Sequence, residues 1–326
     1  MDLIIRRDQN IFRGFSMSGI LGLGKISRKV FERSVFPFIP ADEEPGLDGN
    51  TIRLNGRTVV AHSPSIGVPL DALGFFAFHY AATNVACRFG RPTHMVTGIY
   101  MPLRTGESDL RTIVKGLGDE ARKYNVKVVA GQTATYHGLS IPLVTATCFG
   151  EENMRATSPS EGDAILLIGE IGGEAVWLKR LSEGRQDGRW RRFTPLETVL
   201  RLQDCHGVKL MHDVSEGGLK GALLEVVEHC GLGIDVSSST IPLSEGAGEL
   251  GGDILRAPTY GALVVVTSQD SAEDVASLCA SQRRPCVHLC NLRGSKGLFV
   301  DGTTITEQKR VEIDEIYGTF ERPEKK

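Results

Sequence analysis

Apolar residues recur along the chain at two spacings, and the longer spacing predicts helices. Residues 72–89 are apolar almost throughout and are followed by Gly90 and Pro92, which predicts a long helix that stops at Gly90. Over 109–124 the apolar positions lie three and four residues apart, which predicts an amphipathic helix with Ser108 as its N-cap. Further helices are predicted to begin at Gly172-Gly173 and at Gly217-Gly218, and to cover 195–206 and 271–282.

Alternating or continuous apolar runs bounded by turn residues predict strands. These runs cover 95–103, 126–130, 139–150, 164–168, 234–238, 261–268 and 285–292. Hairpins are predicted at 51–60, with Asn55-Gly56 as the turn, and at 297–306. Loops are expected from Ala61 onward, at Gly131–Thr133 and, because of its charge, at 181–193 on the surface.

The order of these elements indicates two α/β layers joined by a polar turn region. Composition becomes polar around 155–163, so we place an N-terminal domain at 1–154 and a C-terminal domain at 155–320. The charged tail 321–326 is expected to be disordered.

Composition narrows the class of protein. The chain has 326 residues, a formal net charge of −3 and 41% hydrophobic residues, as is typical of a globular protein of about two domains. A near-neutral charge gives no basic field for nucleic acid, so we expect no nucleic-acid partner. No apolar run approaches the ~18–20 residues of a membrane span, and the N-terminus lacks a signal-peptide core, so we expect a cytoplasmic protein without a membrane contact.

The seven cysteines are scattered, which favours reduced thiols over a disulfide framework. Alternation would place Cys286, His288 and Cys290 on one face of a strand. A zinc site would need a second pair of ligands, and no second cluster supplies one. We therefore interpret this motif as one face of a buried strand.

The stretch 211–224, MHDVSEGGLKGALL, is the centre of the second half. Asp213 and Ser215 are good N-cap types, and Gly217-Gly218 would let a backbone or a ligand approach the first turn closely. A helix start with free N–H groups beside Asp213 and Glu216 can hold a phosphate and its metal ion. The alternative is an ordinary capped helix. Its apolar residues follow helical spacing: Leu219, Leu223, Val226 and Val227.

A second glycine-rich segment lies near the N-terminus. Gly19, Gly22 and Gly24 are followed by Lys25, so exposed N–H groups and an ammonium could reach a phosphate. The spacing differs from that of a P-loop. A mobile connector is the alternative interpretation.

Taken together, these segments resemble the aminoimidazole ribonucleotide synthetase superfamily, which includes selenophosphate synthetase, thiamine monophosphate kinase and the hydrogenase-maturation carbamoyl dehydratase. Residues 83–92, TNVACRFGRP, are similar to the family's Asn-Asp-Leu-Ala segment. Residues 108–133 resemble the next helix and its Gly-Glu-Thr or Gly-Asp-Thr loop, and 211–236 resemble the Asp-x-Thr/Ser-x-Gly-Gly-Leu helix. The resemblance extends from about Gly19 to Phe320.

The resemblance implies an α/β (α+β) fold of two domains. A β-rich N-terminal domain would close a barrel across a homodimer, and an α/β sandwich would form the C-terminal domain. ATP and Mg²⁺ would lie in a groove beneath the N-terminal glycine segment, and most members transfer the γ-phosphoryl group to an oxygen. Such transfer turns a poor leaving group into a good one.

Roles for individual residues follow from the resemblance. The phosphate- and nucleotide-binding positions would be Gly19, Gly22, Gly24, Lys25, Asn84, Gly131, Gln132, Thr133, Gly217 and Gly218. The metal would be held by Asp48, Asp213 and Glu216. Asp213, Glu216 and His62 would be the catalytic residues.

Three positions depart from the family pattern. His62, Val85 and Gln132 stand where the family carries acids, so Mg²⁺ binding should be weakened. The histidines could instead form a softer-metal site, although scattered histidines are usually surface or core residues: His62, His79, His94 and His137. Cys290 is the last cysteine before Lys326, which argues against the dehydratase reaction on a C-terminal cysteine.

Two hypotheses about function follow. In the first, the chain is an ATP-dependent phosphotransferase, ligase or cyclase that activates an oxygen of a small molecule or protein group. In the second, it is a non-catalytic dimeric scaffold or regulator that has lost metal-binding acids. The retained glycines and acids favour the first hypothesis, and the substituted acids favour the second.

Overall fold

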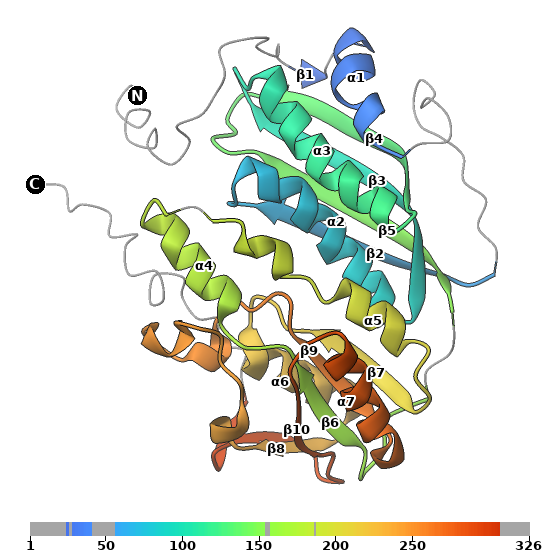
Figure 1. Ribbon diagram of the computed structural model, residues 1–326, viewed down its shortest axis with the longest axis vertical. Coiled ribbons are helices and arrows are strands. Elements are labelled where there is room, and N and C mark those ends of the chain that lie inside the picture. Colours follow the sequence, from blue (N-terminus) through green and yellow to red (C-terminus); the bar gives the residue numbers. More distant parts are fainter. Residues whose placement is uncertain (1–23, 26–27, 41–55, 154–156, 186, 307–326) are drawn as a thin grey trace, which may run out of the picture. The chain divides into compact units, whose positions relative to one another are not determined.

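The computed structural model describes residues 24–25, 28–40, 56–153, 157–185 and 187–306. The chain divides into two compact units (Figure 1). Unit 1 comprises Met1–Val85 with Gly90–Glu152, and unit 2 comprises Ala86–Phe89 with Asn153–Lys326. The mixed α/β class expected from the sequence is confirmed.

Unit 1 is built on a mixed sheet with strand order β1-β4-β3-β5-β2 among the described residues. Strands β3 and β4 are parallel and are connected through helix α3, whereas the other neighbours are antiparallel. The elements of this unit are β1 (Gly24–Lys25), α1 (Arg28–Ser34), the 3-10 helix η1 (Phe36–Phe38), β2 (Thr58–Ile66), α2 (Leu70–Cys87), β3 (Gly90–Pro102), α3 (Glu107–Lys123), β4 (Lys127–Tyr136) and β5 (Leu143–Glu152).

Helices α2 and α3 run side by side across one face of this sheet (Figure 1). Helix α2 confirms the long helix predicted from the sequence; it is apolar around its circumference, and most of its residues are buried. Helix α3 is amphipathic, and its buried side includes Leu110, Ile113 and Leu117. The sheet, α2 and α3 together form the core of unit 1.

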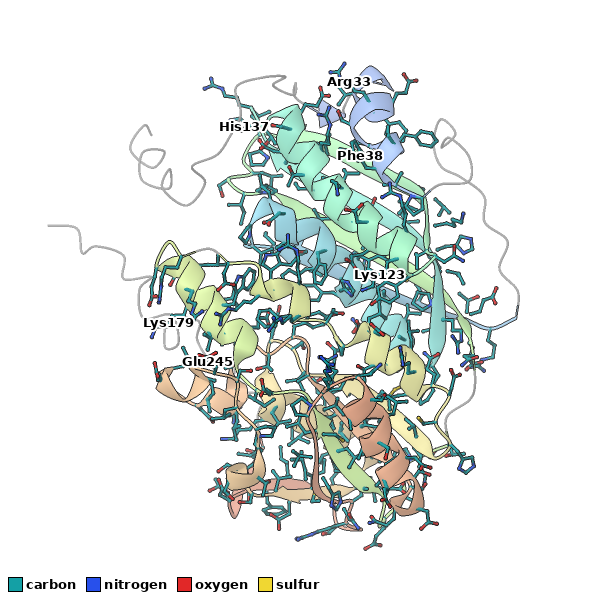
Figure 2. The ribbon with its side chains drawn as sticks, viewed as in Figure 1. Arg33, Phe38, Lys123, His137, Lys179 and Glu245 are labelled. Carbon is teal, nitrogen blue, oxygen red and sulfur yellow. The ribbon has the colours of Figure 1, made fainter. Side chains whose placement is uncertain are left out.

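Residues 28–40, which we call the strap, lie along α3. The strap carbonyl of Phe38 passes so close to Gly118 that a Cβ there would overlap its oxygen. Arg122 donates a hydrogen bond to the Pro37 carbonyl (3.2 Å), and the N–H of Val128 donates to the Pro40 carbonyl (2.9 Å). Figure 2 marks Arg33 and Phe38 on this segment. These contacts therefore hold the strap, which follows β1 in the chain, against α3 and the start of β4.

Unit 2 contains two sheets among its described residues, with orders β10-β6-β9-β7 and β12-β11-β8. Its strands are β6 (Ala164–Ile168), β7 (Val208–Asp213), β8 (Gly233–Val236), β9 (Leu263–Thr267), β10 (Cys286–Asn291), β11 (Gly297–Val300) and β12 (Thr303–Ile305). Its helices are α4 (Gly173–Ser182), α5 (Leu196–Leu202), α6 (Gly218–Cys230) and α7 (Ala272–Ser281), with short 3-10 turns η2 (Arg189–Arg192), η3 (Ser238–Thr240), η4 (Ala247–Glu249), η5 (Ile254–Arg256) and η6 (Gln269–Ser271).

Helix α6 supplies the centre of the unit 2 core. The apolar positions predicted from helical spacing are all buried, and they pack with alternate residues of β6 and β9. Strands β6 and β9 are buried along their whole length, which explains their continuous apolar sequences. The helical prediction for the stretch after Gly217 is confirmed.

Strand β2 corrects the predicted hairpin. Residues 51–55 lie outside the described residues, and β2 runs from Thr58 through Ile66, where the sequence predicted a loop. It pairs with β5, and Pro64 stands opposite Thr145. Because β2 is an edge strand of the sheet formed by the described residues, it can accommodate a proline that lacks a backbone donor.

Helix α3 and the charged insertion also differ from the predictions. Helix α3 starts at Glu107 with Gly106 as its N-cap, and the Asp109 carboxylate accepts the Gly106 N–H at 3.1 Å, so the prediction of Ser108 was wrong. In the predicted surface loop 181–193, Trp190 is buried, and Arg191 lies over its ring at 4.1 Å. Part of this insertion therefore packs into unit 2.

Candidate functional site

The turn between β7 and α6 contains the central motif. Strand β7 ends at Asp213, and the turn closes with a hydrogen bond from the Gly218 N–H to the Ser215 carbonyl at 3.0 Å. Helix α6 has Gly217 as its N-cap, with no side-chain hydrogen bond. The prediction that Asp213 or Ser215 caps this helix was therefore wrong. Asp213 is still in the extended strand, and Ser215 contributes its backbone carbonyl to the turn.

Gly218 faces protein rather than open space. Its φ is +62°, and a Cβ there would lie 2.5 Å from the carbonyl carbon of Arg256 and 2.6 Å from the Leu255 oxygen, both in η5. Gly217 has an ordinary φ of −80°, and a Cβ there would meet only the Gly221 Cα at 3.2 Å. The close approach at Gly218 is therefore made by the protein's own backbone, and Gly217 is the glycine that is open to a ligand.

Asp213 is partly buried, and its burial disfavours the charged form of the carboxylate. Burial raises the pKa of Asp213, while the neighbouring charge of His212 acts in the opposite direction. A carboxylate with a raised pKa at a strand–helix turn is a candidate for binding a cation or for proton transfer. Glu216, three residues after Asp213, is exposed.

His212 and Glu225 form a hydrogen bond beside this turn, from Nε2 to Oε2 at 2.5 Å. Burial opposes protonation of His212, but this bond and the charges of Asp213 and Glu225 outweigh it, so the pKa of His212 is raised. In the sheet His212 stands opposite Val264, which belongs to the core on the α6 side, and Asp213 stands opposite Leu263. Because side chains alternate along a strand, Asp213 points to the face opposite α6.

In unit 1 the fold brings two distant glycine segments together. Strand β1 pairs with β4, so that Gly24 stands opposite Thr135 and Lys25 opposite Ala134. The predicted loop Gly131–Thr133 is instead part of β4, directly before these partners. The basic Gly-Lys segment therefore lies alongside the polar segment that follows Gly131.

A polar clamp holds the strap just after β1. Glu107, the first residue of α3, accepts hydrogen bonds from Arg33 (Nε to Oε1, 2.6 Å) and from the Ser34 hydroxyl, and Arg111 contacts it at 3.2 Å. The Arg33 hydrogen bond lowers the pKa of Glu107 to about 2, with help from Ser34 and from the charges of Arg33 and Arg111, against the effect of burial. The clamp therefore stays ionised near neutral pH.

Two other predicted site residues lie on opposite faces of the unit 1 sheet. Asn84, on α2, donates a hydrogen bond to the hydroxyl of the buried Ser63 (3.2 Å). His62, the neighbouring position on β2, is exposed, and its Nδ1 lies 2.8 Å from the Thr147 hydroxyl. The structure therefore separates His62 from Asn84.

Val85 and Gln132, at the other substituted acid positions, are also separated. Val85 is fully buried, close to Gly90 and Gly150. Gln132 stands opposite Gly98 in the sheet. The histidines have separate partners: His79 is buried and hydrogen-bonded to Glu120 at 2.9 Å, His94 contacts Thr93, and His137 is exposed. Within the described residues, no group of three or more His, Cys, Asp or Glu side chains could hold a metal ion.

Three predicted site residues, Gly19, Gly22 and Asp48, lie outside the described residues. Two features of the structure were not predicted from the sequence: the clamp formed by Arg33, Ser34 and Glu107, and the pair His212–Glu225. The clamp joins residues more than 70 positions apart, so no local pattern could reveal it. The pair on β7 and α6 could have been suspected because His212 lies in the central stretch 211–224 and Glu225 follows it directly.

Comparison with known proteins identifies both units. Residues 48–151 match the family described as AIR synthase related protein, N-terminal domain, and 160–299 match its C-terminal domain. The carbamoyl dehydratase HypE of Escherichia coli (strain K12) is 25% identical over 265 residues, covering 77% of this chain and 75% of that protein. No helix in the described part of the chain is long and apolar enough to cross a membrane.

Solved structures show the same fold. The crystal structure of E. coli HypE, a hydrogenase maturation protein, superposes with a TM-score of 0.74 at 21% identity, covering 87% of this chain and 96% of that chain. The structure of hydrogenase maturation protein HypE in complex with ATP superposes with a TM-score of 0.67 at 17% identity, covering 86% and 93%.

Proposed function

The chain belongs to the AIR synthase related family, and we propose that it binds ATP and transfers its γ-phosphoryl group to an oxygen of a small molecule or protein group. A HypE protein of the same fold was solved in complex with ATP, which supports nucleotide binding here. The acceptor is left as a chemical class, because relatives with this fold differ in what they act on.

The pairing of β1 with β4 carries this proposal. It places Gly24-Lys25 opposite Ala134 and Thr135, directly after the segment Gly131–Thr133, although the two segments are more than 100 residues apart in the chain. Backbone N–H groups and a lysine gathered at one sheet edge are suited to bind phosphate oxygens. The polar clamp on Glu107 supports the proposal further, because it fixes the segment that follows Lys25.

The carboxylates of this chain provide only part of the magnesium site that the family resemblance implies. Mg²⁺ is commonly held by one or two carboxylates together with substrate phosphates. Asp213, the last residue of β7, and Glu216, in the turn that follows, would supply two carboxylates, and the raised pKa of Asp213 indicates a carboxylate that a cation would stabilise. We infer that these two residues would hold the ion jointly with the nucleotide.

We infer the roles of individual residues from the resemblance to the family. In unit 1, Lys25 and the backbone of β1 would neutralise and orient phosphates. In unit 2, the Gly217 N–H at the start of α6 is a candidate donor to phosphate. Asn84 and Thr133 would position nucleotide or acceptor through hydrogen bonds. ATP would supply the phosphoryl group, and Mg²⁺ would neutralise the charge that develops on it. Neither His62 nor Gln132 has the carboxylate that the family uses for the metal.

We also propose that the protein is a homodimer that pairs through the face of the unit 1 sheet opposite α2 and α3. Val60 and Ile66 of β2 are 54% and 51% exposed, and Tyr136 of β4 is 41% exposed. Large apolar side chains gathered on one sheet are typical of an interface. A second copy of the same face would cover them, as a two-fold interface is self-complementary.

A phosphate-release assay with purified protein tests the proposed activity. We expect slow, magnesium-dependent ATP hydrolysis that falls at least tenfold in Lys25→Gln. The matched control is Lys115→Gln, which removes an exposed lysine of α3 paired with Asp119. Equal rates in both variants, at unchanged ATP affinity, would argue against a role for Lys25.

The alternative function is a dimeric scaffold or regulator without catalysis. His62, Val85 and Gln132, which replace the family's acids, favour this alternative. Because Val85 is fully buried, no carboxylate could be restored there without disturbing the core. Dimerisation with no detectable ATP binding would support the scaffold and exclude the phosphotransferase.

A further inference from the structure

The motif Cys286-Val-His-Leu-Cys290 is divided by an irregularity in β10. Cys286 stands opposite Ile168 and His288 opposite Leu166, but the register shifts between His288 and Cys290. Cys290 then stands opposite Ile165, which lies in the core on the α6 side, and packs against that core. The prediction that Cys286, His288 and Cys290 share one face was therefore wrong, because the bulge reverses the alternation.

Cys286 instead has a cysteine neighbour on α7. This helix packs on β6 and β10, and Cys279, near its C-terminal end, is fully buried. The N–H groups of Gln282 and Arg284 donate to the Cys279 carbonyl at 3.0 and 2.9 Å, which folds the chain back from α7 into β10. Across this turn the Cys279 and Cys286 thiols lie close enough for each to shift the pKa of the other.

The two thiols differ in environment. Cys286 is partly exposed, whereas Cys279 has no exposed surface. The hydrogen bond from Cys279 lowers the pKa of Cys286, and the same bond together with burial raises the pKa of Cys279. Thiolates are the reactive form of cysteine. Cys286 is thus the solvent-accessible nucleophile, and Cys279 is the protonated partner behind it.

We propose that Cys279 and Cys286 form a peroxide-sensitive dithiol that closes reversibly to a disulfide between α7 and β10. The Cys286 thiolate attacks one oxygen of hydrogen peroxide, the O–O bond breaks, and hydroxide leaves and takes up a proton to become water. The Cys279 sulfur then attacks the sulfenic sulfur of Cys286, and its proton leaves with the hydroxyl as a second water. Two thiols are oxidised by two electrons in total, and the peroxide is reduced to two waters.

This pair is independent of the proposed ATP chemistry. The residues lie on the α7–β10 turn, and none of them belongs to the candidate site. A disulfide there would link the end of a helix to the start of the adjacent strand, and a dithiol reductant would reverse it.

Peptide mapping of the full-length protein tests the proposal. Protein treated with a small excess of hydrogen peroxide is alkylated and digested with trypsin, which cuts after Arg283 and separates Cys279 from Cys286. We expect one disulfide-linked peptide pair joining these residues, loss of two hydrogens in the intact mass, and full recovery of free thiols with dithiothreitol. Fragmentation distinguishes Cys286 from Cys290, which lie in the same peptide.

Three variants sharpen the test. Cys290→Ser is the matched control and should form the same disulfide at the same rate. In Cys279→Ala, peroxide should leave a sulfenic acid on Cys286 that dimedone traps, and in Cys286→Ser no disulfide should form. A wild-type protein that keeps all seven thiols would overturn the proposal, as would a disulfide that joins Cys286 to Cys290 or Cys279 to Cys205. The wild-type map decides the question even if a variant fails to fold.

Discussion

The neighbouring glycines at the start of α6 give a sharp test of what each one does. Gly218→Ala introduces a side chain at φ +62°, where a left-handed conformation costs an L-residue about 1–2 kcal/mol. The new Cβ would also lie 2.5–2.6 Å from the backbone of Leu255 and Arg256, and relieving such a contact costs about 1–3 kcal/mol. We expect a total destabilisation of about 2–5 kcal/mol.

Gly217→Ala is the matched control. Its φ is −80°, so no torsional strain arises, and its Cβ would meet only Gly221 at 3.2 Å. We expect its stability to change by less than about 1 kcal/mol, which is the usual range for an N-cap substitution. If phosphate approaches this turn, ATP affinity should fall in the Gly217 variant while its stability is retained.

Urea unfolding followed by circular dichroism, together with ATP titration of each folded protein, separates the two effects. The expected pattern is lower stability for the Gly218 variant and weaker ATP binding for the Gly217 variant. A Gly218 variant as stable as the wild type but unable to bind ATP would refute the assignment of Gly218 to packing. Unchanged ATP affinity in the Gly217 variant would remove this turn from the phosphate site.

Three further outcomes are expected. Gly118→Ala should displace the strap and break two or three hydrogen bonds of about 1 kcal/mol each, so the free energy of unfolding should fall by about 2–3 kcal/mol. In the same denaturation assay Gly116→Ala, the control, should raise the free energy of unfolding by up to about 1 kcal/mol. The pKa of Glu107 is lowered from 4.5 to about 2, so its stabilising contribution is complete above pH 4.5 and is lost as the pH falls toward 2. The Glu107→Gln variant should lack this part of the acid-unfolding profile. An identical profile in the variant and the wild type would contradict the role of the clamp. Ile66→Asp should be monomeric in light scattering, because it places a charge on the proposed dimer face. The control Leu243→Asp changes an exposed apolar residue of unit 2 and should remain dimeric. Dimers of both variants would exclude the proposed face.

Local periodicity was sufficient to predict much of the fold. The buried positions of α6 follow helical spacing, and the continuous apolar sequences of β6 and β9 correspond to strands that are buried throughout. Strand β2 was missed because Pro64 indicated a loop, whereas an edge position tolerates proline. Whether a strand lies at an edge depends on the whole sheet, which a local pattern cannot specify.

The candidate site was less predictable because its details depend on long-range contacts. The sequence indicated that a backbone or a ligand could approach Gly217-Gly218 closely, and it could not show that the backbone of η5, nearly 40 residues downstream, makes this approach at Gly218. The clamp on Glu107 joins the strap to α3 across more than 70 residues. The bulge in β10 likewise depends on pairing with β6, so the spacing of Cys286 and Cys290 alone suggested the wrong neighbours.

Titration calorimetry of ATP, with magnesium and with a chelator, tests the proposed site most directly. The wild-type protein should bind ATP weakly and more tightly when magnesium is present, because Asp213 and Glu216 would share the ion with the phosphates. In Asp213→Asn the gain from magnesium should disappear, while the weak metal-independent binding of ATP remains. The absence of ATP binding under every condition, or a magnesium effect that survives Asp213→Asn, would contradict this account.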